Sequence, residues 1–259
     1  MMKTFRSAGL CFLVWILLSA PVFGQGSAGT GGKIEPRYLV DIPTAGMLAK
    51  GSLALDIDFY QEGGVLLGIS AGIFDRLSFG ISYGGSKLIG GEKPVMNDAP
   101  GVNLKIRVIE ENIVLPAIAI GFDSQGKDGY LKELDRYRIK SAGVYAVASK
   151  NYSLAGFLSI HGGVNYSFEG SDDDRDPNVF VGIEKTVGSV VSVTLEYNLA
   201  ANDTDHKAIG RGRGYINAGF SLSFGGGLTL GVNVKDLAQN GGNLKVANRT
   251  VHIEYVKSF

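Results

Sequence analysis

Apolar and polar residues alternate with a period of two in segment after segment of this chain, from residue 52 to the last residue, 259. In residues 191 to 199, "VSVTLEYNL", every second residue is Val, Leu or Tyr, and the residues between them are polar. Such alternation is typical of strands with one apolar and one polar face. Because helical periodicity is almost absent after residue 24, the pattern predicts an all-β fold.

The alternation predicts twelve strands, and most of them have the ~9–11 residues that a tilted strand needs to cross a bilayer. Their expected ranges are 52 to 60, 64 to 74, 77 to 85, 101 to 110, 113 to 122, 140 to 149, 153 to 168, 177 to 186, 190 to 200, 213 to 224, 228 to 237 and 248 to 259. The fifth and sixth are apolar on both faces, so the sequence leaves their orientation open.

The connections between these strands alternate in length. Those after even-numbered strands are short, such as "DR" at 75, whereas most of those after odd-numbered strands are long and polar, such as "EGSDDDRDP". The polar faces are rich in Gly, Ser, Asn and Ala, which suits a narrow lumen better than the surface of a secreted β-sandwich, the main alternative. We therefore predict an antiparallel up-and-down transmembrane β-barrel of about 12 strands.

Aromatic residues fall near the expected strand ends, as in the girdles at membrane interfaces. The outer set is Phe59, Tyr83, Phe122, Tyr166, Phe168, Tyr197 and Tyr215, and the inner set is Phe74, Phe224 and Phe259. The two sets predict two rims of the barrel.

The N-terminus predicts export. Lys3 and Arg6 precede the apolar stretch "LCFLVWILLSA", so residues 1–24 are interpreted as a signal peptide, 25–51 as a periplasmic N-terminal segment and 52–259 as the barrel. Cys11 lies in the signal peptide, which excludes cysteine catalysis and disulfides in the mature chain. The expected location is the bacterial outer membrane. The balance of 25 basic and 25 acidic residues argues against a nucleic-acid partner.

The last strand resembles the C-terminal signal by which the barrel assembly machinery recognises outer-membrane barrels. Val251, Ile253, Tyr255 and Phe259 fit that signal, whereas Lys257 occupies a position that is normally apolar. A long side chain near the rim can lie along lipid and still place its ammonium group among the head groups.

Four sequence features occur in an order that is similar to the YjbH-type outer-membrane proteins of exopolysaccharide operons. They are "PTAG", "GIFDRLSFGISY", "LPAIAIGF" and "VASKNY", and the resemblance covers about residues 40 to 170. It implies a barrel that assists polysaccharide passage or assembly at the outer membrane.

Charged residues on the polar faces are expected to line the lumen. The candidates are Asp56, Asp58, Lys105, Arg107, His161, Glu184, Glu196, Lys235, His252 and Glu254. Charges in a membrane interior are costly unless they are paired or wetted. Pairs of opposite sign would make a cross-braced plug, and separated charges would make a polar channel. Because the first and last strands become neighbours on closure, we expect His252 to meet Asp56 or Asp58.

Two sets of residues contain the types of side chain that catalysis uses. Ser159, His161 and Asn165 share a face, but that face points to the lumen, whereas a lipid hydrolase must present its nucleophile to lipid. The second set comprises acids on expected loops with one histidine, namely Asp172, Asp173, Asp174, Asp176, Asp203, Asp205 and His206. Runs of acids on loops are usually solvated, so we predict no enzyme, no cofactor and no metal site, and leave open whether loop 171–176 binds cations.

The leading hypothesis is a non-enzymatic outer-membrane barrel that assists exopolysaccharide export or assembly. The alternative is a small structural or adhesive barrel that acts through its long extracellular loops. The expected partners are outer-membrane lipid, lipopolysaccharide, the barrel assembly machinery, and polysaccharide or export proteins. Cargo, oligomeric state and the open or plugged state of the lumen are left open by the sequence.

Overall fold

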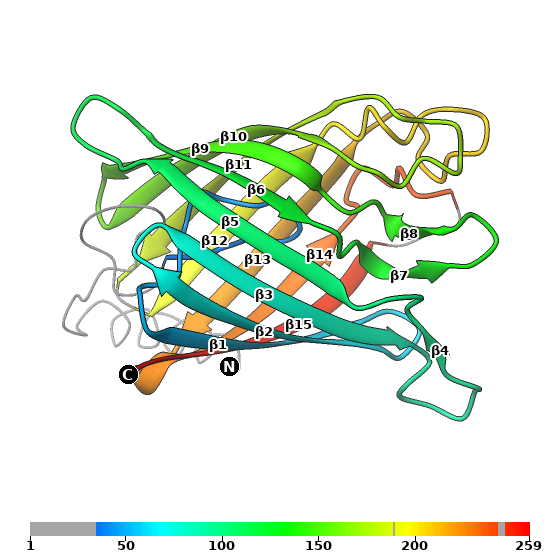
Figure 1. Ribbon diagram of the computed structural model, residues 1–259, viewed down its shortest axis with the longest axis horizontal. Coiled ribbons are helices and arrows are strands. Elements are labelled where there is room, and N and C mark those ends of the chain that lie inside the picture. The colour runs from blue at the N-terminus through cyan, green and yellow to red at the C-terminus, as the bar shows by residue number, and fades with distance from the viewer. Residues whose placement is uncertain (1–34, 189, 243–246) are drawn as a thin grey trace, which may run out of the picture.

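The computed structural model describes residues 35–188, 190–242 and 247–259, and in this part of the chain twelve antiparallel strands form a closed barrel (Figure 1). The expected signal peptide lies outside the described residues. Strand β1 pairs with β2 on one side and with β15 on the other, which closes the sheet. The barrel strands are β1 (Ser52–Tyr60), β2 (Gly64–Phe74), β3 (Leu77–Ser86), β5 (Gly101–Ile109), β6 (Ala117–Asp123), β9 (Gly143–Ser153), β10 (Phe157–Tyr166), β11 (Asn178–Val187), β12 (Val191–Asn198), β13 (Tyr215–Ser223), β14 (Leu228–Lys235) and β15 (Asn248–Ser258). The predicted fold class is confirmed.

Four short elements lie outside the barrel wall. β4 (Val95–Met96) pairs only with the end of β3. β7 (Lys127–Leu131) and β8 (Arg136–Ile139) form a separate hairpin in the connection between β6 and β9. The 3₁₀ turn η1 (Gly225–Gly227) joins β13 to β14. The β7–β8 hairpin was not among the expected strands, because its residues lie in a stretch that reads as a polar loop.

The fifth expected strand begins four residues later than predicted, because residues 113–116 form a turn. The side chain of Asn112 accepts hydrogen bonds from the backbone N–H groups of Val114 and Leu115, at 2.9 and 2.8 Å. Lys150 donates to the carbonyl oxygens of Asn112, Ile113 and Leu115. These hydrogen bonds occupy backbone N–H and C=O groups that a strand would use to pair with its neighbours.

The next turn also lies further along the chain than expected. β9 runs to Ser153, and the reversal occurs at residues 154–156 rather than at 150. Ala155 and Gly156 both have positive φ, 44° and 99°, which turns the chain tightly between two antiparallel strands.

The two faces of the wall have opposite chemistry. On β5, Val102, Leu104 and Ile106 are exposed on the outside, whereas Lys105 and Arg107 are buried on the inside. A soluble sandwich has the reverse arrangement, with its apolar residues inside. Only lipid can cover an apolar band that surrounds a closed sheet with polar residues within it.

The structure also orients the two strands that the sequence left open. Ala117 and Ala119 on β6 face inward, as do Tyr145 and Val147 on β9. Both strands are apolar on both faces because one face meets lipid and the other meets an apolar part of the chain inside the barrel.

The two ends of the barrel differ in the length of their connections. We call them the short-turn end, which carries the C-terminus, and the long-loop end, which carries the β7–β8 hairpin (Figure 1). Tyr83 and Phe168 are exposed near the long-loop end, and Phe74 and Phe224 near the short-turn end, as expected for two girdles. Tyr215 was wrongly assigned to the outer girdle: it is buried, and its hydroxyl donates to Asp203 Oδ2 at 2.7 Å.

No helix in the described ranges has the length and apolar character needed to cross a membrane.

Candidate functional site: the occupied lumen

Residues 35–48, which we call the inserted segment, lie inside the barrel. Figure 1 shows this blue stretch within the ring of strands, and its side chains and backbone bond to inward-facing residues of nine strands. The sequence predicted a periplasmic segment over 25–51, so the described part of it differs from the expectation. The physical reason is that this part carries charged and polar groups that match buried partners on the wall.

The inserted segment is a tight hairpin. The Leu39 N–H donates to the Ile42 carbonyl at 3.1 Å, and the Thr44 N–H donates to the Arg37 carbonyl at 3.1 Å. At the base of the hairpin, a Cβ atom at Gly46 would collide with the Pro36 carbonyl oxygen, so the close approach of the two arms requires glycine. The hairpin therefore enters the lumen and returns within about ten residues.

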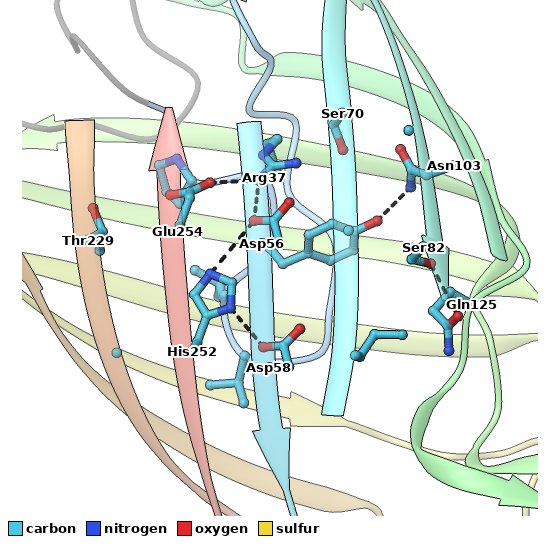
Figure 2. Close-up of a pocket in the computed structure, with 18 of the residues that line it drawn as sticks. Arg37, Asp56, Asp58, Ser70, Ser82, Asn103, Gln125, Thr229, His252 and Glu254 are labelled. Carbon is cyan, nitrogen blue, oxygen red and sulfur yellow. Dashed lines mark hydrogen bonds and ion pairs between the residues drawn. The ribbon is translucent and has the colours of Figure 1, made fainter. Parts of the chain in front are cut away.

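Arg37 anchors one side of the hairpin to the seam where the barrel closes. Its Nη2 atom lies 2.6 Å from Asp56 Oδ1 on β1 and 2.7 Å from Glu254 Oε1 on β15 (Figure 2). Beside them, His252 Nδ1 lies 2.7 Å from Asp58 Oδ1, and His252 Nε2 lies 3.9 Å from Asp56. The predicted meeting of His252 with the carboxylates of β1 is thus confirmed.

Glu196 on β12 holds the apex of the hairpin. Its carboxylate accepts hydrogen bonds from the backbone N–H groups of Val40, Asp41 and Ile42, at 2.9, 2.9 and 3.2 Å. Asn217 Nδ2 donates to the same carboxylate at 2.7 Å. Three consecutive N–H groups aimed at one carboxylate form a strong, charge-assisted contact that fixes the position of the turn.

Lys235 joins the apex to the β7–β8 hairpin. Its Nζ atom lies 2.9 Å from Asp41 Oδ1 and 2.9 Å from Asp128 Oδ2. All three side chains are more than nine-tenths buried. The inserted segment and an element of the long-loop end are therefore held by one cation on β14.

Two cations of β5 bind the returning arm. Lys105 Nζ donates to the carbonyl oxygens of Arg37, Thr44 and Gly46, at 3.0, 3.0 and 3.2 Å. Arg107 donates to the Ala45 carbonyl and forms an ion pair with Glu35. The backbone of the hairpin thus replaces the water that these cations would otherwise bind.

Apolar contact completes the seat of the hairpin. Ile42 packs in one buried cluster with Ala117, Ala119, Val147 and Phe180, and Leu39 packs against that cluster. These residues form the inner faces of β6, β9 and β11. The apolar tip of the hairpin therefore rests on an apolar patch of the wall, while its charged and backbone groups bond to the charged residues around that patch.

A cavity of about 160 Å³ remains beside the hairpin, on the opposite side of the lumen (Figure 2). Its wall is formed mainly by small and polar residues of β1 to β3 and β12 to β15. The lining extends from Ser223 and Thr229 near the short-turn end to Gln125 and Lys127 near the long-loop end. The arrangement is a half-filled barrel with a narrow polar space along its length.

The ten predicted lumen residues all lie on the inner face, and most contact the hairpin or each other. Glu184 differs, since it bonds Ser192 at 2.6 Å and lines the cavity. Arg37, Asp41 and Asp128 were not predicted, because they lie in stretches without strand periodicity. Arg37 and Asp41 are isolated charges in a mostly apolar segment, a signal that alone does not specify a partner, whereas Asp128 lies in a stretch that reads as a polar loop.

The set of Ser159, His161 and Asn165 on β10, which the sequence disfavours as a catalytic site, is not arranged for nucleophile activation. The Ser159 hydroxyl donates to Asn151 Oδ1 at 2.5 Å, whereas His161 Nδ1 lies 2.8 Å from the Ser149 hydroxyl. Asn165 donates to the Ala142 carbonyl at 3.0 Å. Ser159 and His161 are buried and face away from lipid, so the geometry does not support a lipid hydrolase.

Acidic residues of two long loops form ion pairs with basic residues of a third, the connection between β6 and β9. Arg136 is fully buried, and its Nη1 atom lies 2.6 Å from Asp172 Oδ2 and 2.7 Å from Asp203 Oδ1. Lys140 lies 2.8 Å from the other oxygen of Asp172. Burial opposes ionisation of Asp172, but the hydrogen bond from Lys140 and the charge of Arg136 outweigh it and lower the pKa of Asp172.

These ion pairs use the carboxylates that the sequence left open as cation ligands. Asp174 accepts hydrogen bonds from the backbone of Thr204 and Asp205, at 2.7 and 3.1 Å. Within the described ranges, no group of three or more His, Cys, Asp or Glu residues is placed to hold a metal ion. The loops therefore form a cross-linked cap over the long-loop end.

Together, the closed twelve-stranded sheet, the apolar outer band and the polar lumen define a transmembrane β-barrel of the kind found in bacterial outer membranes. A solved structure titled "KdgM porin" is similar to this chain, with a TM-score of 0.50 and 13% sequence identity over 80% of this chain and 99% of that chain. A solved NanC porin aligns over the same shares, with a TM-score of 0.45 and 9% identity. Sequence identities this low compare folds alone. No family model and no curated protein matches the chain, so the YjbH-type resemblance has no support from these comparisons.

Proposed function

We propose that this protein is a restricted passage for ions and small polar solutes through the outer membrane. The observation that carries the proposal is the polar cavity of about 160 Å³ that runs beside the inserted segment. Small polar side chains line it, and its walls carry charges of both signs. A water-filled space of this kind serves ions and small solutes better than apolar molecules.

The inserted segment sets the width of the proposed passage. Without it, the inner faces of β6, β9 and β11 would also border the lumen. Its contacts include ion pairs from Arg37 and Lys235 and backbone bonds to Glu196. Because these contacts hold the segment in one position, we expect the cross-section of the passage to be fixed and narrow.

Conductance of the purified barrel in planar bilayers tests the proposal. We expect small current steps from the full chain and larger steps from a variant in which residues 36–47 are replaced by a short Gly-Ser linker. An absence of steps from both proteins would reject a passage. Equal step sizes would show that the segment does not set the width.

Exopolysaccharide export is the finer role that the resemblance implies, and it needs one further event. The space beside the segment has a volume of only about 160 Å³, so we expect that residues 35–48 have to leave the lumen before a sugar polymer passes. Passage of a neutral oligosaccharide into liposomes through the linker variant alone would support that role. Exclusion from both proteins would reject it.

A structural or adhesive role through the long loops is the second candidate, and the cross-linked loop cap favours it. Asp172 and Asp203, which the sequence suggests are solvated, are instead buried around Arg136. A rigid cap is suited to recognition at the surface. If neither the full chain nor the linker variant conducts, this candidate gains support.

A further inference from the structure

Glu184 on β11 is the carboxylate of the cavity whose charge is least compensated. Its side chain is buried, with about 5% of its surface exposed, and it lines the cavity. Ser192 donates to Oε1 at 2.6 Å, whereas Oε2 has no hydrogen-bond partner among the described residues. Burial of an ionised oxygen without a partner costs free energy, so a partner for this atom has to come from the cavity that Glu184 lines.

The other carboxylates of the cavity already have strong partners. Asp56 and Glu254 are paired with Arg37, and Asp58 with His252. Asp123 accepts hydrogen bonds from the Tyr38 hydroxyl at 2.6 Å and from a backbone N–H at 2.9 Å. Glu184 alone receives a single bond, from a neutral hydroxyl.

The cavity as a whole has an excess of negative charge. Five carboxylates line it, against the basic residues Arg37, Lys105, Lys127 and His252. Arg37 is already shared by two of the carboxylates, and Lys105 is directed at three carbonyl oxygens of the inserted segment. Lys127 Nζ lies over the ring of Tyr38, 4.9 Å from its centre. These basic groups are thus committed elsewhere, and an added positive charge would be favourable at Glu184.

The surroundings of Glu184 supply further oxygen atoms. Thr194 lies opposite Glu184 in the pairing of β11 with β12, and both residues line the cavity. Opposite residues on one face of a sheet have Cβ atoms about 4.5–5.5 Å apart. Ser192 and Ser221 on the same wall add hydroxyl oxygens. A carboxylate with hydroxyl oxygens around it is a ligand set for hard cations.

We propose that Glu184 and the hydroxyl groups around it form a binding site for a small monovalent cation in the half of the lumen near the short-turn end. The site lies three residues before the end of β11 and beside the cavity. Under the proposed function, a cation here would make the passage prefer cations over anions. That consequence rests on the proposed function, but binding at the site does not.

Sodium-23 NMR of the folded protein in detergent tests the binding directly. We expect the wild-type protein to broaden the sodium line, and Glu184→Gln, which keeps the size of the side chain, to lose most of the excess broadening. Asp75→Asn is the matched control, because Asp75 is an exposed carboxylate in the turn between β2 and β3. We expect this control to behave as the wild type. Equal broadening by wild type and Glu184→Gln would overturn the site.

A second measurement does not depend on the folding of any variant. Crystals of the wild-type protein equilibrated with thallium(I) should show an anomalous peak within coordination distance of Glu184 Oε2. A peak would support the site, and its absence at this oxygen would show that water alone fills the space and would overturn the proposal.

Measurements of conductance distinguish the cation site from the proposed passage. In a potassium chloride gradient, we expect a reversal potential of the sign for cation preference, reduced by Glu184→Gln and unchanged by Asp75→Asn. If the barrel does not conduct at all, the proposed function fails, while sodium broadening still decides whether the site exists.

Discussion

Arg37 and Asp56 meet at 2.6 Å between a hairpin inside the barrel and the first strand of its wall. The same guanidinium reaches Glu254 on the last strand at 2.7 Å (Figure 2). One side chain thus bridges the seam at which β1 and β15 close the sheet. Since Arg37 bonds both strands of this closing pair, the position of the hairpin and the closure of the barrel are energetically linked.

We predict that Arg37→Met releases the inserted segment more often. Removal of one partner from a buried ion pair costs about 3–5 kcal/mol, and we expect the lower end because both carboxylates border the polar cavity. About 3 kcal/mol corresponds to roughly a hundredfold larger released fraction. A maleimide can measure that fraction at Ile42→Cys, since residue 42 is buried and the chain after residue 24 has no other cysteine.

Arg76→Met is the control for this prediction. Arg76 forms an ion pair with Glu110 at 3.4 Å, but both side chains are well exposed. Exposed pairs contribute about 0–1 kcal/mol, so the labelling rate should change little. Equal rates in all three proteins would mean that Arg37 does not hold the segment in place.

We also predict that Gly182→Leu displaces the hairpin by volume alone. Gly182 faces inward on β11, and a Cβ atom there would overlap the Leu39 side chain and crowd that of Ile42. A leucine would fill the seat of the hairpin, so we expect larger conductance steps and faster labelling at residue 42.

The control is Gly162→Leu on the neighbouring strand, where a Cβ atom faces lipid and its nearest atom is 3.8 Å away. A hairpin that stays protected in Gly182→Leu would contradict the seat that we describe.

The barrel was predictable from sequence because its strands obey one local rule. Lipid on one side and a wet lumen on the other impose a period of two, and residues 191 to 199 show it without any knowledge of contacts. The contact of His252 with Asp56 or Asp58 was predictable as well, because closure makes the first and last strands neighbours. At Ala119 and Val147 the wall faces the apolar hairpin rather than water, so both faces of the strand are apolar and the alternation disappears. The orientation of these strands could therefore not be predicted.

The inserted segment was not predictable, because its structure depends on distant partners. Arg37 and Glu254 are 217 residues apart, and nothing near Arg37 in sequence specifies a carboxylate on the last strand. The buried Arg136 shows the same limit, since its partners Asp172 and Asp203 lie in two other loops. In the sequence, Asp172 and Asp203 look like solvated charges. In the fold they stabilise the loops, because the buried Arg136 lies between them.

Acid is predicted to loosen the loop cap only below the ordinary range of an aspartate. The pKa of Asp172 is lowered from its usual 3.8, because Lys140 and Arg136 outweigh the effect of burial. Its stabilising contribution is therefore fully present above pH 3.8 and is lost as the pH falls through the lowered value. The Nε–H signal of Arg136 in ¹⁵N-arginine-labelled protein reports the cap, since this group donates to the Tyr137 carbonyl at 2.9 Å. The signal should persist at pH 5 and disappear below pH 3.8, whereas loss already at pH 5 would contradict the lowered pKa.

Arg136→Met is predicted to open the long loops to protease without unfolding the barrel. Asp172 and Asp203 are almost completely buried and would lose the cation between them, and such a loss costs about 3–5 kcal/mol. The wall should survive, because its ladders do not include these loops. We expect rapid cleavage by trypsin at Arg175 or Lys207, while the protein still migrates as a folded barrel in unheated SDS gels.

Lys207→Met is the control for this prediction. It removes an exposed ion pair with Asp173, so the loops of this variant should stay resistant to trypsin at Arg175. Equal resistance of Arg136→Met and wild type would show that the cap does not depend on the buried cation.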